Sequence, residues 1–199
     1  MKAVVKYGRQ PGNVAVREVA EPSINPDQVL VEVGAVGVCG SDIHLWHENQ
    51  SWTIQCPVIL GHEWAGTIVE VGENVAGWTV GERVAVETAA FICGQCSYCL
   101  TGAYHMCPHR QGYGNLIDGA MTKYVAVRPG ILHRIPRAVS FEHAALTEPA
   151  RHQNAIDMFE ERRGVLILEH LALDPVEIDL HLVGDAAMRQ CLDPRFVRV

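Results

Sequence analysis

The chain has 199 residues, of which 48% are hydrophobic and 20% are charged, and this is the composition of an ordinary globular protein with a core. Its formal net charge of −7 argues against nucleic acid as a partner, because binding to phosphates is driven by clustered Lys and Arg. No apolar run is long enough to span a membrane, and Lys2 comes too early for a signal peptide, so we expect a cytoplasmic protein with no membrane partner.

The first 90 residues have the pattern of short strands. Apolar runs rich in β-branched residues are separated by glycines at intervals too short for helices. The runs lie at 3–5, 14–16, 29–33, 66–72 and 80–86. Strands with regular turn signals are typical of a barrel or a sandwich.

The rest of the chain is mixed. After a cysteine-rich, turn-rich lobe at 90–119, we expect a strand at 123–127 and a helix from Ser140 to Leu146, with Ser140 as its N-cap. The character changes after Ala150. There the pattern predicts a helix at 154–163 and strands at 165–168 and 176–182. We therefore predict a domain at 1–150 and a short α/β segment at 151–199.

Four cysteines of the lobe have the spacing C-x2-C-x2-C-x7-C; they are Cys93, Cys96, Cys99 and Cys107. Four thiolates that close on one point are typical of a structural zinc site. Iron–sulfur clusters also use four cysteines, but with other spacings. Disulfides are rare in a reducing cytosol. The spacing thus favours zinc with an architectural role.

A second group of metal-binding side chains is scattered along the chain. Cys39, the pair His62 and Glu63, and Glu148 lie far apart. Taken singly, Cys39 could equally be a small buried hydrophobic residue, and His62-Glu63 could be a capped turn. The residues alone leave both interpretations open.

Five motifs in order decide between them: GVCGSDIH at 37–44, GHEWAG at 61–66, VGERV at 80–84, the four-cysteine lobe, and LTEP at 146–149. Together they resemble the zinc-dependent medium-chain alcohol and polyol dehydrogenase family, closest to its sorbitol and threonine dehydrogenase branch. The resemblance covers residues 1–150. It implies a mainly β fold with short helices, namely a GroES-like β-barrel catalytic domain with a structural zinc lobe.

The resemblance also assigns roles to single residues. Cys39 and His62 would ligate a catalytic zinc, and Glu63 and Glu148 match positions that supply a further ligand directly or through water. Ser41 and His44 match the proton-relay positions. The implied reaction oxidises a small alcohol or polyol at zinc by hydride transfer to NAD or NADP, with two zinc ions per chain.

No segment matches the family's dinucleotide-binding pattern. That pattern is a G-x-G-x-x-G turn between a strand and a helix, and only Gly164 and Gly184 occur after residue 150. We therefore assign no cofactor-binding residue and do not expect 151–199 to form a Rossmann domain. Whether this chain alone turns over substrate depends on a bound hydride acceptor, for which the sequence offers no loop.

Two other functions stay open at this point. One is a non-redox zinc protein, or a remnant without cofactor binding, whose exposed metal binds ligands or hydrolyses a substrate. The other is a structural protein with the four-cysteine zinc alone. The alternating strand predicted at 176–182 offers an edge for a homo-oligomer.

Overall fold

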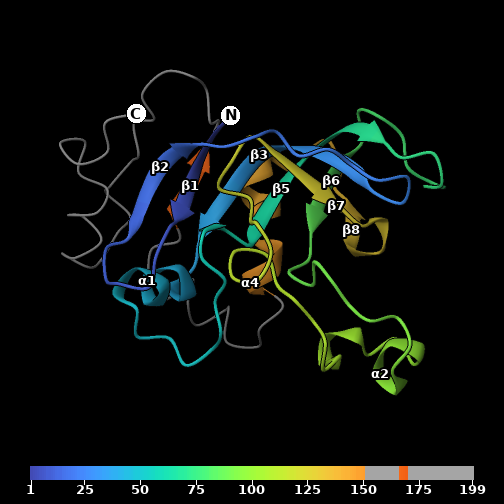
Figure 1. Cartoon of the computed structure of the whole chain (residues 1–199). Coiled ribbons are helices and arrows are strands. Elements are labelled where there is room, and N and C mark those ends of the chain that lie inside the picture. The colour runs from blue at the N-terminus through green and yellow to red at the C-terminus, as the bar shows by residue number, and fades with distance from the viewer. Residues whose placement is uncertain (151–165, 170–199) are drawn as a thin grey trace.

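The computed structural model describes residues 1–150 and 166–169, and this part consists mostly of strands with a few short helices (Figure 1). The predicted mainly β fold class is confirmed. Three strands form a small antiparallel sheet in the order β2-β1-β4. Their bounds are Lys2–Lys6 for β1, Val14–Glu18 for β2 and Val58–Ile59 for β4.

A larger sheet of six strands carries most of the structure. Its order is β7-β3-β5-β6-β8, and β9 also pairs with β3. The strands are β3 (Val29–Val38), β5 (Glu63–Val71), β6 (Arg83–Val86), β7 (Tyr124–Val127), β8 (Leu132–Arg134) and β9 (Leu166–Glu169). β7 pairs with the first half of β3 and β9 with its second half, so both lie along one edge of this long strand. The strand predicted at 165–168 is therefore present, shifted by one residue.

The two sheets share one hydrophobic core. Val5, Val31, Ile68 and Val84 are among its buried residues, as the β-branched runs predict. The sheets are joined where Ala3 forms a β-bridge with Thr122, and where the Val4 N–H donates to the Met121 carbonyl at 2.9 Å. This junction closes the strands around the core.

Helix α3 (Phe141–Ala145) covers one face of the larger sheet, where it packs on β3, β5 and β6. Ser140 caps it, since its hydroxyl accepts the His143 N–H, and this predicted cap is confirmed. The helix lies against an irregularity in β3 at Gly34, where a Cβ atom would clash with the Phe141 ring. Glycine at this position lets the helix approach the strand closely.

The prediction of strands and turns throughout residues 1–90 was wrong at one place. Helix α1 (Gly40–His47) follows β3 directly. Its first turn is fixed by Asp42, whose Oδ2 accepts the Cys39 N–H at 2.9 Å. A side chain three residues into a helix that accepts the N-cap N–H is a known helix start, and the glycines at 37 and 40 concealed it.

The remaining short elements are α2 (Ser97–Leu100), η1 (Tyr104–Met106), η2 (Pro129–Ile131) and α4 (Thr147–Ala150). Among the described residues, no helix has the length and apolar character needed to cross a membrane. The helix predicted at 154–163 and the strand predicted at 176–182 lie outside the described residues.

Candidate functional site

The four-cysteine lobe projects away from the sheets, with α2 at its far end (Figure 1). The Sγ atoms of Cys93, Cys96, Cys99 and Cys107 all lie within 4.8 Å of one another. Backbone N–H groups point at this sulfur cluster: Cys99 donates to Cys96 Sγ, and Cys93 donates to Cys107 Sγ, both at 3.5 Å. Backbone hydrogen bonds from Gln95 and Cys96 lower the pKa of Cys93 to about 6. Cys93 thus favours the thiolate form that binds metals, whereas burial and the neighbouring sulfur atoms raise the pKa of Cys99 to about 12.

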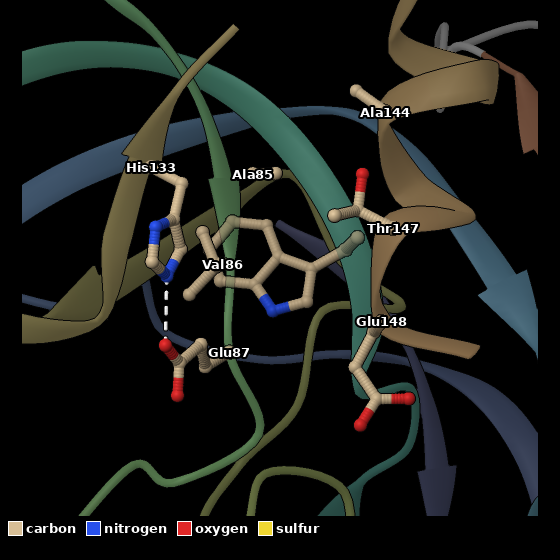
Figure 2. A pocket seen from close by; sticks show the side chains of 8 residues that line it. Ala85, Val86, Glu87, His133, Ala144, Thr147 and Glu148 are labelled. Atoms are coloured by element: carbon tan, nitrogen blue, oxygen red, sulfur yellow. Dashed lines mark hydrogen bonds and ion pairs between the residues drawn. The ribbon is translucent and has the colours of Figure 1, made fainter. Parts of the chain in front are cut away.

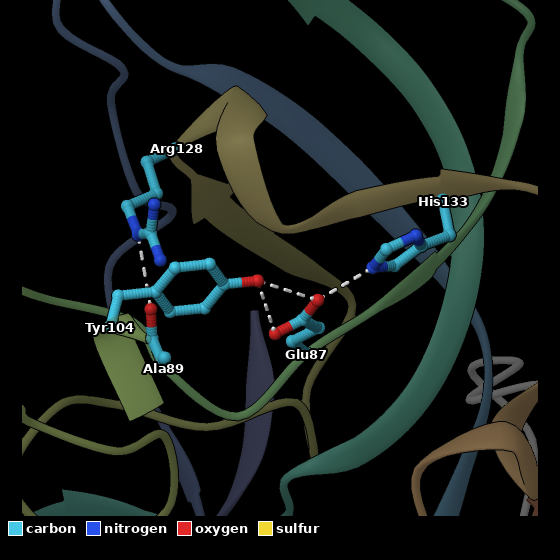
Figure 3. Close-up of polar contacts among 5 residues, drawn as sticks. All are labelled: Glu87, Ala89, Tyr104, Arg128 and His133. Carbon is cyan, nitrogen blue, oxygen red and sulfur yellow. Dashed lines mark hydrogen bonds and ion pairs between the residues drawn. The ribbon is translucent and has the colours of Figure 1, made fainter. Parts of the chain in front are cut away.

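The part of the lobe around α2 and η1 exposes several large apolar side chains. Tyr98, Leu100 and Met106 are exposed, Leu100 by 74%. The Tyr104 side chain connects the lobe to the barrel: its hydroxyl donates to both Glu87 carboxylate oxygens at 2.9 and 3.0 Å (Figure 3). His133 on β8 lies 2.7 Å from the same carboxylate. Tyr104 therefore attaches the lobe to the end of β6 through a charged acceptor.

A second cluster forms where distant segments meet. The ligand atoms of Cys39, His62 and Glu63 all lie within 4.8 Å of one another. Cys39 is the N-cap of α1, His62 precedes β5, and Glu63 is the first residue of β5. Glu63 on β5 pairs with Gly37 on the neighbouring strand β3, and a Cβ atom at Gly37 would lie 2.8 Å from Glu63 Oε2. Glycine at position 37 leaves room for the carboxylate.

Asp42 joins this cluster and was missed by sequence reasoning. It is buried, and its Oδ1 lies 3.9 Å from His62 Nδ1 with no hydrogen-bond partner in the described part of the chain. The signal that could have found it is the C-x-x-D spacing, in which Asp42 accepts the Cys39 N–H.

The cluster of acidic groups holds positive charge at His62. Burial opposes a charged imidazole, but Cys39, Asp42 and Glu63 outweigh burial and raise the pKa of His62 to about 9. Burial raises the pKa of both Asp42 and Glu63, and His62 opposes each rise. A cation is thus stabilised where the three ligand atoms converge.

The cluster faces a cavity of about 350 Å³. Its lining residues are Cys39, Ser41, Leu45, Trp52, His62, Glu63, Thr88, Arg110, Gly112, Tyr113, Gly114, Asn115, Glu148 and Pro149. Glu148 therefore faces the same cavity as the cluster, but its carboxylate is not part of the close group of ligand atoms. Of the tryptophans, Trp52 lines this cavity.

The two predicted relay residues lie on α1. Ser41 Oγ is 3.3 Å from His62 Nε2 and lines the cavity. His44 is exposed, and its Nδ1 lies 2.9 Å from Asn49 Oδ1. Residues three apart lie on one face of a helix, so Ser41 at the cavity and His44 at the surface are neighbours on α1.

A smaller pocket of about 150 Å³ lies beside the cavity and shares Glu148 with it. Figure 2 shows Ala144, Thr147 and Glu148 along one side of this pocket, opposite Val86 and Glu87 at the end of β6. Trp64 also lines it and is only 1% exposed, so this indole belongs to the core next to the cavity.

Comparison with known proteins places this arrangement in a family. Residues 25–137, more than half of the chain, match the alcohol dehydrogenase GroES-like domain. The chain therefore belongs to the alcohol dehydrogenase GroES-like domain family. The predicted GroES-like fold is confirmed.

Individual relatives agree with the predicted branch. The chain is 46% identical to sorbitol dehydrogenase of Halalkalibacterium halodurans, over 84% of this chain and 49% of the relative. It is 38% identical to L-threonine 3-dehydrogenase of Pyrococcus abyssi, over 79% and 43%. The crystal structure of galactitol-1-phosphate dehydrogenase from Escherichia coli superposes with a TM-score of 0.67 at 33% identity, over 75% and 42%. The chain spans about half the length of the curated relatives it matches.

Proposed function

We propose that this chain provides the metal-binding catalytic domain of a zinc-dependent alcohol or polyol dehydrogenase. The observation that carries the proposal is the meeting of Cys39, His62 and Glu63 within 4.8 Å at the wall of a 350 Å³ cavity. A cavity of this size suits a small-molecule substrate. The proposed reaction is oxidation of a small alcohol or polyol with NAD or NADP as hydride acceptor.

The residues present fit zinc. A thiolate, an imidazole and a carboxylate are common zinc donors, and three protein ligands with one exchangeable position are typical of a catalytic site. Asp42 supplies the outer support: its unpartnered Oδ1 faces His62 Nδ1, while His62 Nε2 lies on the side of Ser41. A carboxylate behind a metal-binding histidine orients the ring and fixes its tautomer.

We assign the second zinc to the four-cysteine lobe. The sulfur cluster of Cys93, Cys96, Cys99 and Cys107 is compatible with a closed, structural site. The zinc would stabilise the lobe, because metal binding in such sites is itself folding free energy. Its proposed role is architectural.

The proposed chemistry divides the work between groups. Zinc, when bound, supplies Lewis acidity that makes an alcohol proton easier to remove. Ser41 accepts that proton at its hydroxyl, and His44 passes it from the surface of α1 to solvent. Glu148, which faces the cavity, serves as a further ligand directly or through water. These roles follow from the family resemblance, and the positions of Ser41 and Glu148 in the cavity lining support them.

We propose residues 1–150 as the catalytic unit and 151–199 as a short separate segment. β9, from the latter, pairs with β3 of the former. The described residues carry no G-x-G-x-x-G turn, so no nicotinamide-binding residue is assigned. The proposal extends to a cytoplasmic protein that acts on a small molecule and that can form a homo-oligomer.

Metal analysis combined with cofactor titration tests this proposal. We expect about two zinc ions per chain, from the two clusters. Cys39→Ser should leave about one, whereas Cys56→Ser should leave about two because Cys56 lies outside both clusters. A wild-type chain that binds only one zinc contradicts the catalytic site.

Calorimetry with NAD and NADP then shows whether the chain alone binds the hydride acceptor. Absence of binding at millimolar concentration limits this chain to the metal-binding half of the reaction.

A further inference from the structure

Arg110 is the arginine that lines the proposed substrate cavity among the described residues. It lines the cavity together with Cys39, His62 and Glu63 and is half-buried there. Its Nη2 donates to Thr88 Oγ1 at 2.6 Å. Its Nε is buried without an acceptor, and no carboxylate in the described part of the chain lies within ion-pair distance of it.

Two other arginines near the lobe and the barrel have more partners than Arg110. Arg128 also has a buried nitrogen without a partner, Nη2, but it donates from Nε to the Ala89 carbonyl and lies over the Tyr104 ring (Figure 3). Arg134 pairs with Glu82 at 2.6 Å. Both have a structural use for the guanidinium. Arg110 has one hydroxyl partner and faces a cavity.

A half-buried guanidinium without a counter-ion is costly, because it stays charged and loses part of its water. Its planar fork of N–H groups matches the paired oxygens of a phosphate or a carboxylate. A ligand that brings such an anion into the cavity would supply the missing acceptors.

We propose that Arg110 binds an anionic group of the substrate, so that the substrate is a polyhydroxy compound carrying a phosphate or a carboxylate. The inference rests on the proposed function, since it assumes that a hydroxyl of the same molecule reacts at the Cys39 cluster. The names of the relatives do not decide it: one is named for sorbitol, a neutral polyol, and another for galactitol 1-phosphate. The choice therefore follows from Arg110 in this chain.

The test compares three ligands with closely related carbon chains: glucitol, glucitol 6-phosphate and gluconate. Each is titrated calorimetrically into the zinc-loaded full chain. We expect at least one charged ligand to bind about tenfold more tightly than glucitol, the gain expected from charge-assisted hydrogen bonds. Tighter binding of the phosphate ester identifies a sugar-alcohol phosphate, and tighter binding of gluconate identifies a hydroxy acid.

Variants assign the preference to the guanidinium. Arg110→Gln should abolish it, and Arg110→Lys should keep only part, because an ammonium keeps the charge but lacks the fork. Arg137→Gln removes the same charge from an exposed position outside the cavity and should keep the full preference. Equal binding of all three ligands by the unmodified chain overturns the inference without any variant. So does a preference that survives in Arg110→Gln, since the metal alone would then bind the anion.

The same titrations in Cys39→Ser separate the two proposals. If that variant and the unmodified chain contain equal zinc, the proposed function fails, whatever the ligand preference. If the unmodified chain holds the second zinc but shows no preference for charged ligands, only the inference about Arg110 fails.

Discussion

The two clusters of candidate metal ligands in this chain are assembled in opposite ways. The cysteines of the lobe lie within residues 93–107 and meet through local turns on a projection with exposed apolar side chains. Cys39, His62 and Glu63 are brought together by β3, α1 and β5, which are anchored in the common core. We expect the first cluster to need its metal to organise the surrounding chain, and the second to be organised by the fold before any metal binds.

Because of this difference, the loss of a metal ligand should have different effects in the two clusters. A local site without a core should fail structurally when a ligand is lost, because the metal supplies its folding free energy. A site whose side chains are held by a packed sheet should lose metal binding and activity while the fold stays intact. The predictions below test that contrast, from the largest expected effect on stability to the smallest.

Loss of a lobe cysteine should have the largest effect. Structural zinc sites contribute on the order of 10 kcal/mol of binding free energy that is coupled to folding, so Cys96→Ser should unfold residues around 91–111 and lower the soluble yield. Hydrogen exchange of the lobe amides measures the local unfolding. Ser97→Ala, next to it on exposed α2, is the control. Protected lobe amides in Cys96→Ser would show that the lobe does not depend on its metal.

The second cluster should depend on how α1 is held at its far end. Lys6 is fully buried, and its Nζ lies 2.7 Å from Glu48 Oε2 at the C-terminal end of α1. Glu48 also has a left-handed backbone, with φ of 52°, which is unfavourable for a residue with a Cβ atom. The ion pair therefore holds α1, which begins at Cys39, in a conformation that costs free energy.

Lys6→Met should lower the free energy of unfolding by about 2–3 kcal/mol, because it leaves a partly buried carboxylate unpaired. It should also weaken zinc binding at the Cys39 cluster while the lobe keeps its metal, so that the lobe serves as an internal control. Denaturant unfolding and zinc content give the two measurements. Lys2→Met on the same strand, which has no ion pair in the described residues, should change neither. Equal loss from both clusters would mean that the whole fold is affected rather than α1.

Tyr104→Phe should have a smaller effect, confined to the attachment of the lobe. It removes a hydrogen bond to the Glu87 carboxylate, which is worth about 1–2 kcal/mol when the acceptor is charged and partly buried. We expect faster hydrogen exchange in the lobe and an unchanged exchange rate in β5. Tyr98→Phe, at an exposed tyrosine of the same lobe, should have no effect.

Cys39→Ser should have the smallest effect on stability and the largest on chemistry. The side chain is half-buried, and its neighbours are held by the sheet, so, apart from the stabilisation lost with the bound zinc, we expect a change below about 0.5 kcal/mol, as at most positions outside the core. The variant should still lose one zinc and any alcohol oxidation. A large loss of stability here, with a mild effect of Cys96→Ser, would reverse the roles assigned to the two clusters.

The sequence predicted the metal-binding residues of the two regions in different ways. The grouping of the lobe cysteines could be predicted from the sequence, because the short spacing between Cys93 and Cys107 brings their sulfur atoms together. For the second region, the spacing of Cys39, His62 and Glu148 carries no geometry, and the motifs led to it only through a family resemblance. Helix α1 was missed because the glycines around it resemble turns and its start depends on Asp42. No sequence pattern indicates a binding role for Arg110, because that role depends on the groups that surround its guanidinium in the folded chain.

By itself, the sequence determined the β character of residues 1–90 outside α1, the cap at Ser140 and the closed grouping of the lobe cysteines. These features follow from local periodicity, hydrogen bonding and short loops. Only the tertiary structure decided that Glu63 fits against Gly37, that Asp42 supports His62, and that Arg110 shares a cavity with Cys39. Those relations depend on strand register and on packing between segments far apart in the chain, and no local pattern encodes such distances.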